Sequence, residues 1–351
     1  MVIFLKKIIV LLISFMIMIC MNTNVVKAET YFVRSYIVMD YHTGEILESK
    51  EKDLKRSVAS ISKIMTAIVA IENSSLDSFV EVNEDILKAY GSSIYLKVGE
   101  VVTMKDLLYG LMLRSGNDAA VTIARGVSGK IETFVELMNK KAQEIGMTNS
   151  YFNNPSGLDV DDEGNISTSY DMALLMRYAL KNNVFREITS TKEYRSSNHG
   201  TWLNKNKLLR QYENTSGGKT GFTTKARRTL VTSARKEGME LIVVTLDCGG
   251  DFAFHKSLYE KYFKSHKTFN LLKEGSNFFE EYELVCDSDI NVTLENEQVK
   301  NNKIVYKIKG DQATVILKGN EEKIIGECSA LKNNVENKKE NWFIRMIKKI
   351  F

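Results

Sequence analysis

Three short motifs in this chain carry side chains that could cut an amide bond. The first is Ser60-Ile61-Ser62-Lys63, in which the serine and the lysine are three positions apart. On a helix these two side chains share one face, so the lysine amine can take the serine proton if burial lowers its pKa. The Ser60 hydroxyl would then attack a carbonyl carbon. Because Ser-x-x-Lys occurs five times in the sequence, this motif alone equally fits a surface lysine beside a serine at a helix start.

The other two motifs carry groups that could hold a peptide substrate. Ser115-Gly116-Asn117 offers a hydroxyl that can pass a proton to a leaving amine, and an amide that can bind a substrate carbonyl and Lys63. Lys219-Thr220-Gly221 offers a positive charge for a carboxylate, a hydroxyl donor, and a glycine that lets a peptide pair along a strand edge. Taken singly, the first would also make a helix cap and the second a hairpin turn.

Helices and strands must bring these motifs together. Apolar residues lie nearly all round segment 57–72, which predicts a buried helix that carries Lys63. Further helices are predicted at residues 104–114, 118–127, 131–145, 171–181 and 256–263. Strands are predicted at residues 35–40, 218–222, 228–234 and 239–246. This order indicates an α+β fold, an antiparallel sheet flanked by helices.

The C-terminal part of the chain has a different pattern. Short strands at 281–286, 290–294, 303–308 and 313–317 predict a small β domain over residues 269–330, followed by a polar connector at 331–340. Residues 341–351 are predicted to form an amphipathic helix, with Arg345, Lys348 and Lys349 opposite an apolar face. Such a helix suits the interface of a membrane, here the outer surface of the cytoplasmic membrane, although a helix docked on the protein is the alternative.

The first 28 residues have the pattern of an export signal. Lys6 and Lys7 precede an apolar run over residues 8–21, and cleavage is expected after Ala28. The alternative is an uncleaved anchor, but the run is short for a span of about 20 residues. Residues 29–268 then form the predicted catalytic domain.

Charge and cysteine content narrow the possible functions. The net charge of +4 is too small to indicate nucleic-acid binding. Cys248, Cys286 and Cys328 remain after the predicted cleavage, and their spacing matches no zinc motif. Export would permit a bridge between Cys286 and Cys328, but free or buried thiols are the expectation.

The three motifs occur in the order known from penicillin-binding proteins and class A β-lactamases. Over residues 36–263 the chain resembles the serine D-alanyl-D-alanine carboxypeptidase family, the low-molecular-weight penicillin-binding proteins. Three further stretches carry the resemblance: residues 59–66, Asn154-Pro155-Ser156-Gly157-Leu158-Asp159, and residues 204–209. It implies a β-lactamase/transpeptidase-like domain followed by a small C-terminal β domain.

The resemblance also implies a mechanism and a substrate. Ser60 is the nucleophile, Lys63 its base, and Ser115 a proton relay. Substrate is held by Asn117, Lys219, Thr220 and Gly221, and the oxyanion by the backbone N–H groups of Ser60 and Phe222. The implied substrate is a peptidoglycan stem peptide ending in D-Ala-D-Ala, β-lactams are implied covalent inhibitors, and no metal or cofactor is required.

The chain departs from the family pattern at several positions. Many relatives have proline where Val58 stands. Many also have an arginine that binds the substrate carboxylate, where this chain has Asp247-Cys248-Gly249-Gly250-Asp251 and no arginine. The carboxylate is therefore expected to meet Thr220, Lys219, Arg227 or Arg228. His255 is expected to be structural. The run 226–230 and the pair Asp251…His255 resemble a branch that includes sporulation-associated enzymes.

Two alternative functions stay open at this point. A class A-type β-lactamase needs a loop glutamate in a Glu-x-x-Leu-Asn setting, and Glu163 in loop 153–165 lacks that setting. A non-catalytic penicillin-binding scaffold would bind peptidoglycan without turnover, but the intact set of motif residues argues against it.

Overall fold

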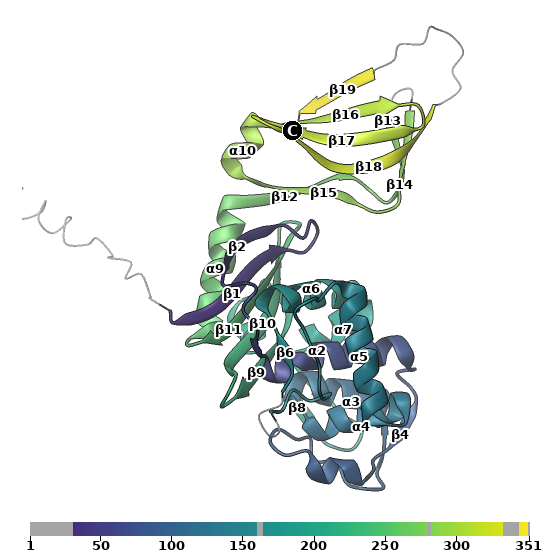
Figure 1. Cartoon of the computed structure of the whole chain (residues 1–351), viewed down its shortest axis with the longest axis vertical. Helices are drawn as coiled ribbons and strands as arrows, with labels where there is room; N and C mark the ends of the chain where they lie inside the picture. Colours follow the sequence, from purple (N-terminus) through teal and green to yellow (C-terminus); the bar gives the residue numbers. More distant parts are fainter. Residues whose placement is uncertain (1–30, 160–163, 280–281, 333–343, 350–351) are drawn as a thin grey trace, which may run out of the picture. The chain divides into compact units, whose positions relative to one another are not determined.

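A computed structural model describes residues 31–159, 164–279, 282–332 and 344–349 of the chain (Figure 1). The predicted export signal, most of the predicted connector, and Glu163 lie outside the described residues. The chain divides into a first unit, residues 1–32, and a second unit, residues 33–351, and the description below concerns the second. Within it we distinguish the N-terminal part (residues 33–265) from the β part (residues 266–349).

The N-terminal part is built on a five-stranded antiparallel sheet with strand order β2-β1-β11-β10-β9. Its strands are β1 (Val33–Asp40), β2 (Ile46–Lys50), β9 (Thr215–Thr223), β10 (Arg227–Lys236) and β11 (Met239–Cys248). Strand β11 is buried along almost its whole length, as its continuous run of apolar residues requires of a strand covered on both faces. Strand β9, which carries Lys219-Thr220-Gly221, lies at the edge of the sheet.

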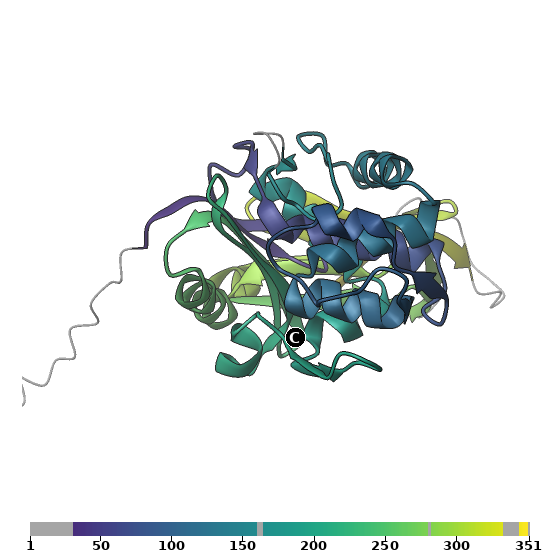
Figure 2. The same cartoon turned by 90° about the horizontal axis from the view of Figure 1, so that it is seen from below.

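Helices cover both faces of this sheet, and the α+β fold class is confirmed. Helix α9 (Asp251–Ser265) packs on β10 and β11, and α6 (Ser169–Ala179) packs on β1 and β11. In Figure 2 the green α9 lies on one side of the strands and the blue helices of the first third of the chain lie on the other. The remaining helices of this part are η1 (Ala59–Ser62), α2 (Lys63–Asn73), η2 (Glu84–Lys88), α3 (Met104–Tyr109), η3 (Gly110–Arg114), α4 (Asn117–Ser128), α5 (Ile131–Ile145), α7 (Asn183–Ser190) and α8 (Leu208–Gln211).

Six short strands pair off outside the main sheet. They are β3 (Arg56–Ser57) with β6 (Ile166–Ser167), β4 (Phe79–Glu81) with β5 (Val101–Thr103), and β7 (Glu193–Arg195) with β8 (Thr201–Leu203).

The predicted helix at 57–72 is correct in its buried core but begins as the 3-10 turn η1, and the helix predicted at 104–114 ends in the π-helical turn η3.

The β part has its own apolar core, to which Leu284, Val292 and Val315 belong. Strand β12 (His266–Leu272) pairs with β15 (Ile290–Glu295), and a six-stranded sheet follows the order β13-β14-β18-β17-β16-β19. Its strands are β13 (Gly275–Phe279), β14 (Tyr282–Cys286), β16 (Lys303–Lys309), β17 (Gln312–Lys318), β18 (Glu322–Lys332) and β19 (Ile344–Lys349), and α10 (Asn296–Asn301) follows β15. Strands β12, β13 and β18 and helix α10 were missed by the sequence patterns.

Two predictions for the β part are wrong. A disulfide joins Cys286 on β14 to Cys328 on β18, where free thiols were expected; the two strands are neighbours and bring the Cα atoms to 4.6 Å. The connector predicted from residue 331 begins too early, because β18 continues to Lys332. Cys248, in contrast, is a buried free thiol as predicted.

The amphipathic helix predicted at 341–351 is also wrong where the structure describes it. Residues Ile344–Lys349 form strand β19, which pairs antiparallel with β16. Without β19, β16 would be an edge strand with unpaired backbone N–H and C=O groups, and pairing satisfies them. Apolar spacing in so short a segment does not separate a helix from an added strand. No helix within the described residues is long and apolar enough to cross a membrane.

Candidate active site

Ser60 sits in the turn η1, one residue after a strained position. Ala59 has a left-handed backbone with φ of 50°. Gly157 packs against this turn so closely that a Cβ there would lie 2.0 Å from the Ala59 carbonyl oxygen, so glycine is required at that position. This contact holds loop Asn154–Gly157 against the residue before the nucleophile candidate, and Lys63 Nζ lies 3.2 Å from Ser60 Oγ.

The amine of Lys63 is fully buried and surrounded by acceptors. It donates to Asn117 Oδ1 at 2.7 Å and to the backbone carbonyl of Ser156. Burial, followed by the nearby charge of Lys219, lowers the pKa of Lys63 well below its usual value. A neutral lysine beside a serine hydroxyl can act as a general base. The Ser156 carbonyl was missed by the motif analysis, because only the fold brings it to Lys63.

The second motif lies where one helix ends and another begins. The π-helical turn η3 ends at Arg114, the next residue Ser115 has a left-handed backbone with φ of 64°, and Asn117 is the first residue of α4. The Asn117 amide nitrogen donates to the Tyr90 carbonyl at 2.6 Å. Because this bond fixes the amide, its oxygen is directed at Lys63.

The third motif is held by edge strand β9. Lys219 is buried and donates to the Thr220 carbonyl at 2.8 Å. Burial and the charge of Lys205 lower the pKa of Lys219 to about 7. A Cβ at Gly221 would lie 3.0 Å from the Ser60 nitrogen and 2.4 Å from Thr229 Oγ1, so a side chain here would push β9 away from η1. The glycine therefore brings the strand edge against the turn that carries Ser60.

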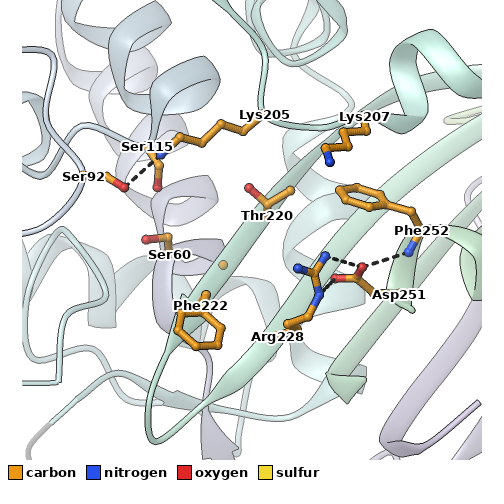
Figure 3. A pocket seen from close by; sticks show the side chains of 11 residues that line it. Ser60, Ser92, Ser115, Lys205, Lys207, Thr220, Phe222, Arg228, Asp251 and Phe252 are labelled. Carbon is orange, nitrogen blue, oxygen red and sulfur yellow. Dashed lines mark hydrogen bonds and ion pairs between the residues drawn. The ribbon is translucent and has the colours of Figure 1, made fainter. Parts of the chain in front are cut away.

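The motifs meet in one cavity of about 330 Å³ (Figure 3). It is lined by Ser60, Ser92, Ser115, Lys205, Lys207, Thr220, Gly221, Phe222, Arg228, Asp251 and Phe252. Lys63, Asn117 and Lys219 lie behind this lining, where they contact the residues already described. Every residue predicted for the site is thus either on the wall of the cavity or directly behind it.

The structure adds residues to which sequence reasoning gave no role. Lys205 Nζ donates to Ser92 Oγ at 2.9 Å, and Lys207 lines the same wall. Both lysines fall in residues 204–209, one of the stretches that carried the family resemblance, but the sequence did not show that they lie near Ser60. With Arg228 the lining holds three cations and one carboxylate, that of Asp251, so the cavity favours an anionic ligand.

Two further expectations can be compared with the geometry. Among the candidates for the substrate carboxylate, Thr220 and Arg228 line the cavity, whereas Arg227 is exposed and is not part of its lining.

His255 is buried away from the site and bonds Thr232 and Thr245 through its two ring nitrogens, at 2.7 and 2.9 Å. Burial lowers the pKa of His255 to about 3. The prediction that His255 is structural is confirmed.

Comparison with known proteins places this geometry in a known group. A sequence model of the family described as D-alanyl-D-alanine carboxypeptidase matches residues 22–250. The chain is 32% identical over 310 residues to the D-alanyl-D-alanine carboxypeptidase DacF of Bacillus subtilis, covering 82% of this chain and 79% of DacF. It is 34% identical over 318 residues to DacC of Escherichia coli, covering 84% of this chain and 79% of DacC.

Solved structures agree with the sequence comparison. Penicillin binding protein 5 from Haemophilus influenzae superposes with a TM-score of 0.76 at 27% identity, covering 88% of this chain and 98% of that one. The D-alanyl-D-alanine carboxypeptidase from Mycobacterium tuberculosis superposes with a TM-score of 0.63 at 31% identity, covering 66% of this chain and 91% of that one.

Proposed function

The chain belongs to the D-alanyl-D-alanine carboxypeptidase family of serine peptidases, and we propose that it removes the terminal D-alanine of peptidoglycan stem peptides through an acyl-enzyme on Ser60. The observation that supports the choice of nucleophile is the Lys63 amine, fully buried and 3.2 Å from Ser60 Oγ. The family resemblance carried by the three motifs is confirmed by the comparisons.

Acylation begins when Lys63 Nζ takes the proton of Ser60 Oγ. The oxygen attacks the carbonyl carbon between the two D-alanines, and the backbone N–H groups of Ser60 and Phe222 donate to the negative oxygen that forms. Loss of one such donor typically costs about 10²- to 10³-fold in rate. Asn117, Thr220 and the glycine edge at Gly221 hold the peptide, and its C-terminal carboxylate faces the cationic wall of the cavity.

Collapse of this intermediate breaks the C–N bond and leaves an ester on Ser60. The departing D-alanine nitrogen receives a proton through Ser115, which passes on the proton held by Lys63, or from Lys219, which then recovers a proton from Lys63; their positions at and behind the cavity wall suit that role. Either route returns Lys63 to its neutral form. A water molecule then gives a proton to the Lys63 amine and attacks the ester carbonyl. Ser60 Oγ takes the proton back as the shortened peptide leaves. β-Lactams enter the same sequence and remain on Ser60 as the stable ester.

The test is the substitution Ser60→Ala. It should abolish both labelling by a fluorescent penicillin and D-alanine release from a pentapeptide ending in D-Ala-D-Ala, while circular dichroism stays that of the native fold. A matched control is Ser49→Ala, since Ser49 heads another Ser-x-x-Lys motif but lies exposed on β2, and this variant should keep both activities. Labelling that survives Ser60→Ala would place the nucleophile elsewhere.

The two alternatives predict different behaviour in one chase experiment. A β-lactamase would lose its bound penicillin label within seconds, whereas a carboxypeptidase keeps the label for much longer. A scaffold would release no D-alanine at all. The comparisons favour neither alternative, because the family model and the similar curated proteins are D-alanyl-D-alanine carboxypeptidases.

The family acts outside the cytoplasm, and we propose that this chain is exported by its first 28 residues. The support is the pattern of Lys6 and Lys7, an apolar run and Ala28. Attachment to the outer face of the cytoplasmic membrane is proposed from the basic and aromatic composition of 341–351 alone, since residues 344–349 form a strand. Mass measurement of the secreted chain tests the first point. Membrane fractionation after truncation before Asn341 tests the second, and unchanged membrane binding would contradict it.

A further inference from the structure

A second cavity adjoins the one that holds Ser60. Its volume is about 460 Å³, and its walls come from α8 and the first turns of α9. Lys207, Arg228, Asp251 and Phe252 line both cavities. Figure 3 shows these four residues grouped at one end of the first cavity, away from Ser60. The second cavity therefore continues from that end, and the proposed hydrolysis of a peptide ending in D-alanine leaves it unused.

The second cavity is positively charged. Among the described residues that line it, Lys207, Arg228 and Lys256 are cations and Asp251 is the one carboxylate. Arg228 occupies this carboxylate, because its Nη2 donates to Asp251 Oδ1 at 2.6 Å and its Nε to Oδ2 at 3.2 Å. The Phe252 backbone nitrogen also donates to Oδ1 at 2.9 Å, and the Asp251 side chain is only 3% exposed. With Asp251 satisfied in this way, the two lysines are the charge that the cavity offers to a ligand.

Both lysine amines are accessible to a ligand. The Lys207 amine has no hydrogen-bond or ion-pair partner within the described part of the chain. Lys256 Nζ lies 3.7 Å from Glu260 Oε1, which is longer than a hydrogen bond, and its side chain is 45% exposed. Leu208 and Phe252 add apolar surface to the same wall. This combination suits a ligand with a chain of methylene groups that ends in an anion.

The part of the substrate nearest to this second cavity is the leaving residue. In the proposed binding mode the acyl part of the peptide runs along Gly221 of β9, and the terminal carboxylate faces the cationic end of the first cavity. The four shared residues lie at that same end. A long side chain on the leaving residue would therefore enter the second cavity, whereas the methyl group of D-alanine occupies little of its volume.

We infer that the second cavity is a subsite for a leaving residue larger than alanine, in which Lys207 and Lys256 bind a carboxylate at the end of its side chain. The inference rests on the proposed function, because the leaving residue is defined by the bond that is cut at Ser60. The class of substrate is a peptide whose last residue is a D-amino acid with a long acidic side chain. This second carboxylate is distinct from the terminal one, which every substrate keeps. The C–N bond that breaks and the ester that forms on Ser60 are those of the D-alanine reaction, and only the leaving amine differs.

The experiment compares three peptides that differ only in the side chain of the last residue. They are diacetyl-lysyl-D-Ala followed by D-alanine, by D-α-aminopimelate, or by the side-chain amide of D-α-aminopimelate. The released amino acid is measured by mass spectrometry, and active sites are counted with saturating fluorescent penicillin. Wild type should have a kcat/KM about 3- to 10-fold higher for the side-chain acid than for its amide, the range for a partly exposed charge pair. This ratio should shrink in about 0.5 M salt, because salt screens exposed charges.

Variants of Lys256 test the subsite without changing the cavity that holds Ser60, because Lys256 lines only the second cavity. Lys256→Gln should bring the acid-to-amide ratio toward one and leave D-alanine release unchanged. Lys256→Glu should invert the ratio, and Lys256→Arg should preserve it. Lys264→Gln is the matched control, since Lys264 is exposed about two turns further along α9 and lines neither cavity, and it should behave as wild type.

Three outcomes would overturn the inference while the proposed function stands. The first is an equal kcat/KM for the side-chain acid and its amide in wild type. The second is a preference for the acid that survives Lys256→Glu. The third is release of D-alanine without release of either longer residue, since the second cavity would then not admit them. Failure of the proposed function has a separate sign, because wild type would then release no D-alanine from the first peptide.

Discussion

The N-terminal part and the β part of the molecule bury different kinds of side chain. The N-terminal part buries charged groups, among them Lys63, Lys219 and Glu240. In residues 266–279 and 282–332 of the β part, Thr293 is the one buried polar side chain, and the core is otherwise made of apolar residues and the Cys286–Cys328 disulfide. The two parts are thus stabilised by different means.

This difference indicates where the chemistry resides. Burial of an amine disfavours its charged form, so Lys63 and Lys219 reduce the stability of the N-terminal part. The same burial lowers the pKa of both amines, that of Lys219 to about 7, which favours acid–base chemistry. Glu240 remains charged because Arg186 and Arg235 both bond it. The β part carries no comparable cost among its described residues. Substitutions at the buried lysines of the N-terminal part should therefore change mainly activity, whereas substitutions in the core of the β part should change mainly stability.

The largest effect is expected at Lys63, the proposed base of Ser60. Lys63→Met should lower the rate of penicillin acylation by about 10³-fold or more, since Ser60 would lose the group that takes its proton. Thermal stability should change less, because the substitution removes a buried amine but leaves the Asn117 and Ser156 oxygens without their donor. Stopped-flow labelling and a thermal melt measure the two quantities.

The matched control for this substitution is Lys52→Met. Lys52 closes another Ser-x-x-Lys motif, but its amine pairs with Asp53 at the surface, and acylation should proceed as in wild type. Acylation of Lys63→Met within tenfold of the wild-type rate would show that another group accepts the Ser60 proton.

A change in the β part should lower stability and leave the labelling of Ser60 unchanged. Replacing both Cys286 and Cys328 by serine opens a link between residues 42 positions apart, which should lower the free energy of unfolding of the β part by about 4 kcal/mol. Hydrogen exchange of strands β14 and β18 reports this loss. Labelling of Ser60 should not change, because the disulfide lies in a core separate from the one that holds α2. Slower labelling in the double variant would show that the two parts are coupled.

The sequence predicted the N-terminal part well because its patterns are long. The apolar run of β11 and the nearly continuous apolar surface of α2 leave few alternatives for a strand or a helix. The end of the β part was predicted poorly for the opposite reason. Strand β19 is six residues long, and its conformation depends on the open edge of β16, which no local pattern records.

The candidate site likewise contains residues that the sequence predicted and contacts that it did not. Ser60, Lys63, Asn117 and Lys219 were predicted because their motifs have fixed spacing. The Ser156 carbonyl on Lys63 and the Arg228–Asp251 pair were not, because each is made by segments that approach only in the fold. The left-handed turn at Ala59 was equally out of reach, since it depends on the close approach of Gly157.

The smallest predicted effect concerns pH and affects only the N-terminal part. The pKa of Lys219 is lowered to about 7, first by burial and then by the charge of Lys205. If the charged form of Lys219 is needed for acylation, the rate should fall by up to about tenfold per pH unit above pH 7. Burial also lowers the pKa of Lys63 well below its usual value, which favours the neutral form that its proposed role as base requires.

Stability should move in the opposite direction over the same range. Between pH 7 and 9 an unfolded Lys219 is protonated while the folded one is not, so the unfolded state binds more protons and the free energy of unfolding rises with pH. Lys219 alone contributes about 1 kcal/mol per pH unit to this rise. The β part, with no buried lysine in residues 266–279 and 282–332, should show neither trend. Acylation rates and urea unfolding at pH 6, 7, 8 and 9 measure both slopes. If the acylation rate and the free energy of unfolding both rose or both fell with pH, titration of Lys219 would not be the cause of the two trends.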